Sequence, residues 1–60
     1  MTIDKIKHYM SPVIFNHWVN IKDVSFVIKA EKQLKKEIES GMRTDIKYIA
    51  ELNLLQYLLR

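Results

Sequence analysis

The segment Thr44–Arg60, T-D-I-K-Y-I-A-E-L-N-L-L-Q-Y-L-L-R, contains the densest run of leucines in this chain of 60 residues. At about 100° of rotation per residue, its apolar side chains fall into two rows along a helix. One row is Tyr48, Leu52, Leu55 and Leu59, and the other is Ile46, Ala50, Leu54 and Tyr57, with Leu58 beside Leu54. A helix at the surface of a globular protein needs only one apolar row, so the two rows predict burial on two sides.

Helix-start signals divide the first third of the chain into two short helices. Thr2 is a favourable N-cap for a helix over residues 3–10. Ser11 and Pro12 then combine a preferred N-cap with a preferred first helical residue, and the residue before a proline is pushed out of the helical region. One helix therefore ends there, and an amphipathic second helix is predicted over residues 13–19.

A polar junction separates the second helix from a longer third one. Either Asn20 or Asp23 is a suitable cap for a helix over residues 24–40, and Gly41 is the natural residue to end it. Thr44 is the expected N-cap of the last helix. Because the connection between the third and fourth helices is short, we expect them to lie side by side as a helical hairpin.

These elements predict an all-α fold, a compact bundle of three to four short helices that forms one domain over residues 1–60 and assembles as a dimer. A small α+β fold is the alternative, because residues 12–28 are rich in Val, Ile, Phe and Trp and also fit a β meander. The Ser-Pro start and the absence of Asn-Gly or Asp-Gly turns favour helices. The predicted core consists of Ile14, Phe15, Trp18, Val27, Leu34 and Ile38.

The size of the chain favours association with another protein. A domain of this length buries only about 60% of its unfolded surface, so its stability alone is marginal. We therefore expect one row of the last helix to close the core and the other to meet a second copy of the chain or another protein, without a preference for either row. The alternative is a closed four-helix monomer, in which the first two helices cover one row and the third helix covers the other. The predicted interface residues are Ile46, Tyr48, Leu52, Leu54, Leu55, Tyr57, Leu58 and Leu59.

Composition points to the cytoplasm. The chain has no cysteine, which fits a reducing compartment, and its N-terminal region lacks the features of a signal peptide. The apolar C-terminal segment is interrupted by Glu51, Asn53 and Gln56 and falls short of the roughly 20 apolar residues that span a bilayer. No membrane association is expected.

The sequence contains no pattern typical of catalysis or metal binding. His8 and His17 do not have the spacing of a metal site and bring no third ligand, and a single glycine leaves no room for a phosphate-binding loop. We expect no enzyme activity, no cofactor, no metal and no small-molecule substrate.

Basic side chains provide a candidate contact for an anionic partner. Lys29, Lys32 and Lys36 form a lysine stripe along the third helix, and Arg43 follows it, in a chain with a net charge of +3. An acidic protein surface and the phosphates of a nucleic acid both fit such a stripe. The last helix has too few polar side chains to act as a DNA-reading recognition helix.

The function predicted is a non-catalytic protein-interaction module that docks an apolar helix surface with a basic flank onto a protein partner, onto itself, or both. A small intracellular regulator or inhibitor, of the kind that phages and plasmids encode, would fit this description. A dimeric nucleic-acid-binding protein that uses the lysine stripe is one alternative. A structural subunit of a larger assembly is the other.

Overall fold

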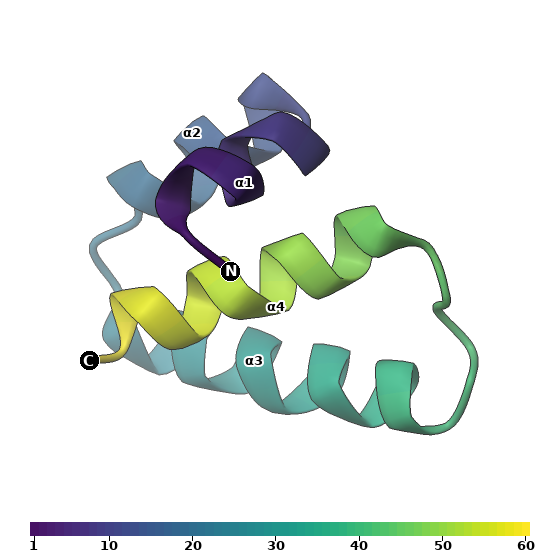
Figure 1. Ribbon diagram of the computed structural model, residues 1–60. Coiled ribbons are helices and arrows are strands. Elements are labelled where there is room, and N and C mark those ends of the chain that lie inside the picture. The colour runs from purple at the N-terminus through teal and green to yellow at the C-terminus, as the bar shows by residue number, and fades with distance from the viewer.

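The computed structural model describes every residue from Met1 to Arg60, and the chain forms four helices and no strand. Helix α1 spans Ile3–Tyr9, α2 spans Pro12–Asn20, α3 spans Val24–Glu39 and α4 spans Ile46–Leu58 (Figure 1). The all-α prediction is confirmed. The alternative of a meander in residues 12–28 is wrong, because α2 and the beginning of α3 occupy that segment.

The first three helices begin at the caps that the sequence favours. The Thr2 hydroxyl accepts a hydrogen bond from the backbone N–H three residues later, at 3.4 Å. Pro12 occupies the first position of α2, where its missing N–H costs no helical bond, and the Ser11 hydroxyl makes no capping bond. Asp23 caps α3 by accepting the N–H of Ser25 at 3.1 Å, which decides between the two caps predicted for this junction.

Helix α3 ends in a Schellman motif at Gly41, as its sequence position predicts. Gly41 adopts a positive φ of 81° and donates its N–H to the carbonyl of Ile38 at 3.1 Å. The N–H of Met42 reaches back to the carbonyl of Glu37 at 3.0 Å. This left-handed conformation costs about 1–2 kcal/mol for residues with a Cβ atom, so glycine allows the sharp reversal into the α3–α4 hairpin without that strain.

Helix α4 begins after Asp45, and the prediction that Thr44 is its N-cap is wrong. The Asp45 carboxylate accepts the backbone N–H of Lys47 at 3.1 Å. Both residue types cap helices well, but the aspartate also places a negative charge at the positive end of the helix dipole. The helix ends at Leu58, two residues before the predicted end.

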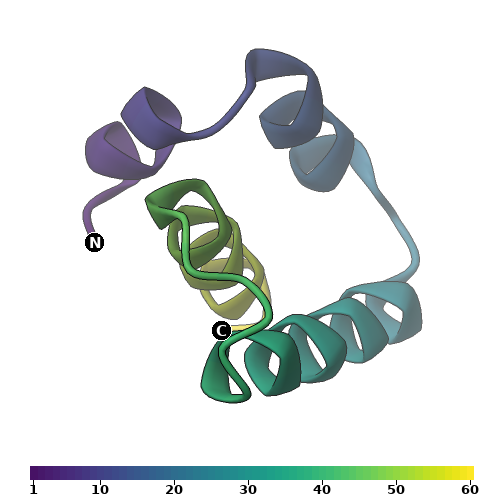
Figure 2. The same cartoon turned by 90° about the vertical axis from the view of Figure 1, so that its right-hand side faces the viewer.

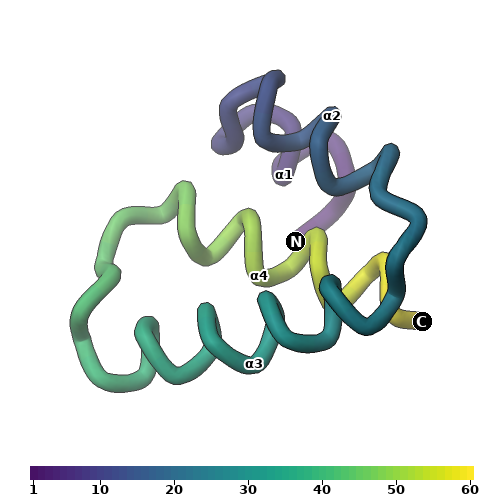
Figure 3. The backbone as a smooth tube through the Cα atoms, turned by 180° about the vertical axis from the view of Figure 1, so that it is seen from behind, coloured from purple at the N-terminus to yellow at the C-terminus, as the bar shows by residue number.

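The four helices are arranged in layers with α4 in the middle. Helices α1 and α2 lie on one side of α4, and α3 lies antiparallel to it on the other side (Figures 1 and 3). Figure 2, which looks roughly along α4, shows the other three helices grouped around it. The main contacts between helices are those that α4 makes with α1, α2 and α3.

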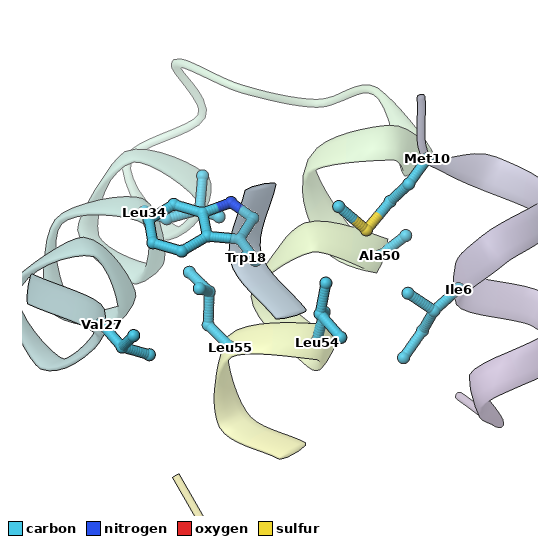
Figure 4. Close-up of a cluster of buried hydrophobic side chains, with 8 residues drawn as sticks. All are labelled: Ile6, Met10, Trp18, Val27, Leu34, Ala50, Leu54 and Leu55. Atoms are coloured by element: carbon cyan, nitrogen blue, oxygen red, sulfur yellow. The ribbon is translucent and has the colours of Figure 1, made fainter. Parts of the chain in front are cut away.

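The central residues of both apolar rows of α4 find partners within the chain. Ile6 and Met10 of α1 approach Ala50 and Leu54, whereas Leu55 faces the side chains of α3 together with Trp18 of α2 (Figure 4). The predicted burial on two sides is therefore supplied by the chain's own helices. The fully or nearly fully buried residues are Ile6, Met10, Trp18, Val27, Leu34, Ala50, Leu54 and Leu55.

Most of the predicted core residues lie in or against this cluster. Trp18, Val27 and Leu34 are buried, and Phe15 and Ile38 pack partly buried against the core. The prediction that Ile14 belongs to the core is wrong, because 44% of its surface is exposed. Helix α2 rests on α4 through Trp18, so the residue one turn earlier lies at the edge of the contact.

Candidate protein-binding surface

One side of α4, between α1 and α3, is left uncovered by the other helices (Figure 2). It carries Ile46, Ile49 and Tyr57, which are 45%, 38% and 57% exposed. Helical periodicity places these three side chains within about 80° of one another. We refer to these three residues as the exposed side of α4. Large apolar side chains that gather on one helix side after folding are typical of contact surfaces.

The fold divides the predicted interface residues into three groups. Leu54 and Leu55 are buried in the core and do not reach the surface. Tyr48, Leu52 and Leu58 are partly buried against the core. Ile46, Tyr57 and Leu59 remain exposed, but Leu59 belongs to a different surface, where it lines a small apolar hollow with Val19 and Val24.

Sequence reasoning missed Ile49, because it belongs to neither of the two rows. In helical projection it lies about halfway between Leu52 and Ile46. Once α1 covers Leu54 and α3 covers Leu55, the sector that remains exposed contains Ile49 and borders on Ile46 and Tyr57. Helical projection therefore gives the position of Ile49, but only the packing of the neighbouring helices shows that this position stays exposed.

The lysine stripe lies on the outer surface of α3. Lys29, Lys32 and Lys36 are all exposed. In helical projection they point away from Val27 and Leu34, which face the core. The sequence prediction that these lysines share one side of the helix fits this placement.

Lys35 connects the stripe to the exposed side of α4, although the sequence analysis did not select it. It lies one turn after Glu31, whose carboxylate accepts a hydrogen bond from Gln56 of α4 at 3.4 Å. Glu31 thereby marks the side of α3 that borders α4 near Tyr57. Lys35 is exposed on that same side of α3, in helical projection about 60° from Lys32.

Acidic and basic side chains are used differently by the fold. Five of the seven acidic side chains accept hydrogen bonds within the chain, namely Asp23, Glu31, Glu37, Asp45 and Glu51. Of the ten lysines and arginines, only Arg43 forms a salt bridge. The lysines of α3 consequently carry positive charge that no acidic group of the chain neutralises at close range.

Arg43 does not extend the lysine stripe, because it is bound to another group. Its Nε donates a hydrogen bond to Glu37 Oε1 at 2.7 Å, and its guanidinium lies 4.7 Å from the centre of the Tyr48 ring. The hydrogen bond from Arg43, with a second one from Gln33, lowers the pKa of the Glu37 carboxyl. Arg43 thus acts as a tether between α3, the following loop and α4.

The two histidines are exposed on α1 and α2, and their rings meet the neighbouring Tyr9 and Trp18 edge-on. No three His, Cys, Asp or Glu side chains are grouped in a way that would hold a metal ion. None of the four helices combines the length and the apolar composition needed to cross a bilayer.

No protein-family model, no curated protein and no solved structure matches this chain. The function is therefore inferred from the chemistry of the surface.

Proposed function

We propose that this chain is a non-catalytic protein-interaction module that binds a protein partner through the exposed side of α4. The observation that carries the proposal is the exposure of Ile46, Ile49 and Tyr57 together on the central helix of the fold. Side chains of this kind contribute most to affinity when a partner removes them from water, at about 1.5–3 kcal/mol for each fully buried aliphatic or aromatic group.

The lysines of α3 define the chemistry of the partner. Lys35 lies on the side of α3 that borders α4, Lys32 of the stripe is its neighbour, and neither has an acidic group within salt-bridge distance. Complementary charges at the rim of an interface mainly accelerate encounter and exclude wrong partners. We therefore expect the partner to present an apolar helix or groove with acidic side chains beside it. The role that we propose on this basis is that of a regulator or inhibitor, which acts by blocking the partner's surface.

A homodimer is the weaker form of the proposal. The sequence argument for it was that one leucine row would otherwise meet water, yet Leu54 and Leu55 are both buried within a single chain. A second copy is thus not needed to cover the leucines at the centre of either row, and in the Leu54 row only Ile46 and Tyr57 stay exposed. An acidic partner with an apolar surface would bury the exposed side chains of α4 and also pair with the lysines of α3.

The test compares Ile49→Asp with Val13→Asp in partner capture from the native host. Val13 is a matched control, because it is an aliphatic residue on a helix surface, 77% exposed and outside the exposed side of α4. Circular dichroism would establish that both variants are folded. We expect the wild type and Val13→Asp to retain one stoichiometric partner and Ile49→Asp to lose it. Equal retention by both variants would refute the proposed surface.

A nucleic-acid-binding function is the second candidate, favoured by the unneutralised lysine stripe. Binding through phosphates falls steeply as salt concentration rises, because counterions are released from the nucleic acid. Retention on DNA at low salt that is lost with Lys29→Glu and Lys36→Glu, but unchanged with Ile49→Asp, would support this candidate over a protein partner.

A further inference from the structure

A groove runs between α2 and α3, on the side of α3 away from the exposed side of α4. Its larger part has a volume of about 300 Å³ and is lined by residues from three helices, among them Trp18, Ala30, Leu34, Tyr48 and Glu51. A second hollow of about 210 Å³ adjoins it and shares Tyr48 and Glu51. Together they form an elongated, mostly apolar depression along α4, a shape that suits a chain segment better than a compact small molecule.

Glu51 is the unpaired charge on the floor of this groove. Its Oε2 accepts a hydrogen bond from the indole Nε1 of Trp18 at 3.2 Å, which holds the partly buried carboxylate in place without neutralising it. The other carboxylate of the larger part, Glu37, is already paired with Arg43. Lys47 lines the adjoining hollow, but its ammonium lies 5.2 Å from the centre of the Tyr48 ring and forms no salt bridge.

The walls of the groove remain open to a partner. Ile14, which lines the adjoining hollow on the α2 side, is 44% exposed. Outside the lining, the ring of Phe26 lies 6.2 Å from that of Trp18, centre to centre, and this residue is 53% exposed. An apolar surface around one uncompensated carboxylate complements a lysine or arginine, whose stem is apolar and whose tip is charged. Removing two opposite charges from water together is favourable only when they pair closely. The partner's lysine or arginine must therefore lie directly beside Glu51.

We propose that the groove binds an amphipathic helical segment of another protein, which places one lysine or arginine beside Glu51 and apolar side chains against Trp18 and Leu34. This site is independent of the exposed side of α4. Because the chain has a net charge of +3, non-specific electrostatics oppose the approach of a basic segment. Binding of such a segment therefore requires a specific site.

The probe is a leucine–arginine amphipathic peptide of about 14 residues, the length at which isolated helices become marginally stable. A leucine–glutamate peptide with the same apolar face is its control. Trp18 is the only tryptophan, so its fluorescence and its single indole N–H resonance report directly on the groove. We expect saturable changes in both signals with the arginine peptide and none with the glutamate peptide.

Glu51→Gln keeps an acceptor for Trp18 and removes the charge, so it should weaken binding about ten-fold, which corresponds to about 1.4 kcal/mol. Glu39→Gln removes the same charge from an exposed position and should leave the affinity unchanged, as should Ile49→Asp. Ala30→Arg, which fills the groove with a cation of the chain itself, should abolish binding even if Glu51→Gln folds poorly.

Three outcomes would overturn the proposal. The first is equal weakening by Glu51→Gln and Glu39→Gln, and the second is the absence of any Trp18 response to the arginine peptide. The third is self-association of the chain alone that disappears with Glu51→Gln in sedimentation, because the occupant would then be a second copy.

Discussion

The indole Nε1 of Trp18 donates a hydrogen bond to Glu51 Oε2 at 3.2 Å, across 33 positions of sequence. This bond joins α2 to α4, and the Trp18 ring belongs to the same core cluster as Leu34 and Leu55 (Figure 4). A single side chain thus fixes the position of α2 by both packing and polar contact. It also fixes the carboxylate on which the groove depends.

A double-mutant cycle with Trp18→Phe and Glu51→Ala should reveal a coupling of about 0.5–1.5 kcal/mol in the free energy of unfolding, because a partly buried hydrogen bond is removed. The measurement is urea denaturation followed by far-ultraviolet circular dichroism. The matched pair Trp18→Phe with Glu39→Ala should be additive. Additivity of the Trp18–Glu51 pair would show that the bond contributes nothing to stability.

Leu54→Ala should lower the free energy of unfolding by about 2–5 kcal/mol, because the side chain is fully buried and its loss leaves a cavity. That is a large share of the total for a domain of this size. Leu59→Ala, the same change at the C-cap of this helix, where the side chain is 36% exposed, should cost no more than about 1 kcal/mol. Similar losses in thermal or urea denaturation would contradict the placement of α4 in the middle layer.

Gly41→Ala should destabilise the chain by about 1–2 kcal/mol through backbone strain alone. The φ of Gly41 is 81°, and a Cβ there would meet no atom within 4 Å, so no clash contributes. Chemical synthesis with D-alanine at position 41 provides the matched control, because a D-residue favours positive φ. The D-alanine protein should be at least as stable as the wild type in thermal denaturation, and destabilisation by both residues would show that the strain argument fails.

Acid should destabilise the chain partly through Glu37. The hydrogen bond from Arg43 lowers the pKa of this carboxyl below its ordinary value of 4.5. A lowered pKa in the folded state means that the stabilisation is complete above the ordinary pKa and is lost as the pH falls through the lowered value.

Urea denaturation at a series of pH values from about 7 to about 3 measures this loss. We expect the stability of Glu37→Gln to fall less steeply with acid than that of the wild type. The pKa of Asp23 is lowered mainly by the hydrogen bond from the Ser25 hydroxyl, so Asp23 should contribute a similar loss of stability in acid in both proteins. Identical pH profiles would show that the Arg43–Glu37 pair does not stabilise the folded chain.

The sequence by itself determined the helices of this protein. Ser11-Pro12, Asp23 and Gly41 are local signals, because an N-cap, a fixed φ or a left-handed residue acts within one turn of the backbone. The two-row pattern of Thr44–Arg60 likewise follows from helix geometry, and it correctly predicted a helix buried on two sides. Where two good caps are adjacent, as at Thr44 and Asp45, local preference did not separate them.

Only the tertiary structure decided which surfaces remain free. The two rows of α4 are equally apolar, so nothing local could determine that α1 would cover Leu54 and α3 would cover Leu55. The position of the neighbouring helices leaves Ile49 exposed on α4. The exposure of Ile14 likewise depends on packing, because Ile14 lies at the edge of the contact between α2 and α4. The carboxylate in the groove also depends on packing, because Trp18 and Glu51 meet only when α2 is laid across α4. Burial depends on how two helices pack against each other, whereas periodicity and capping depend on the sequence of a single helix.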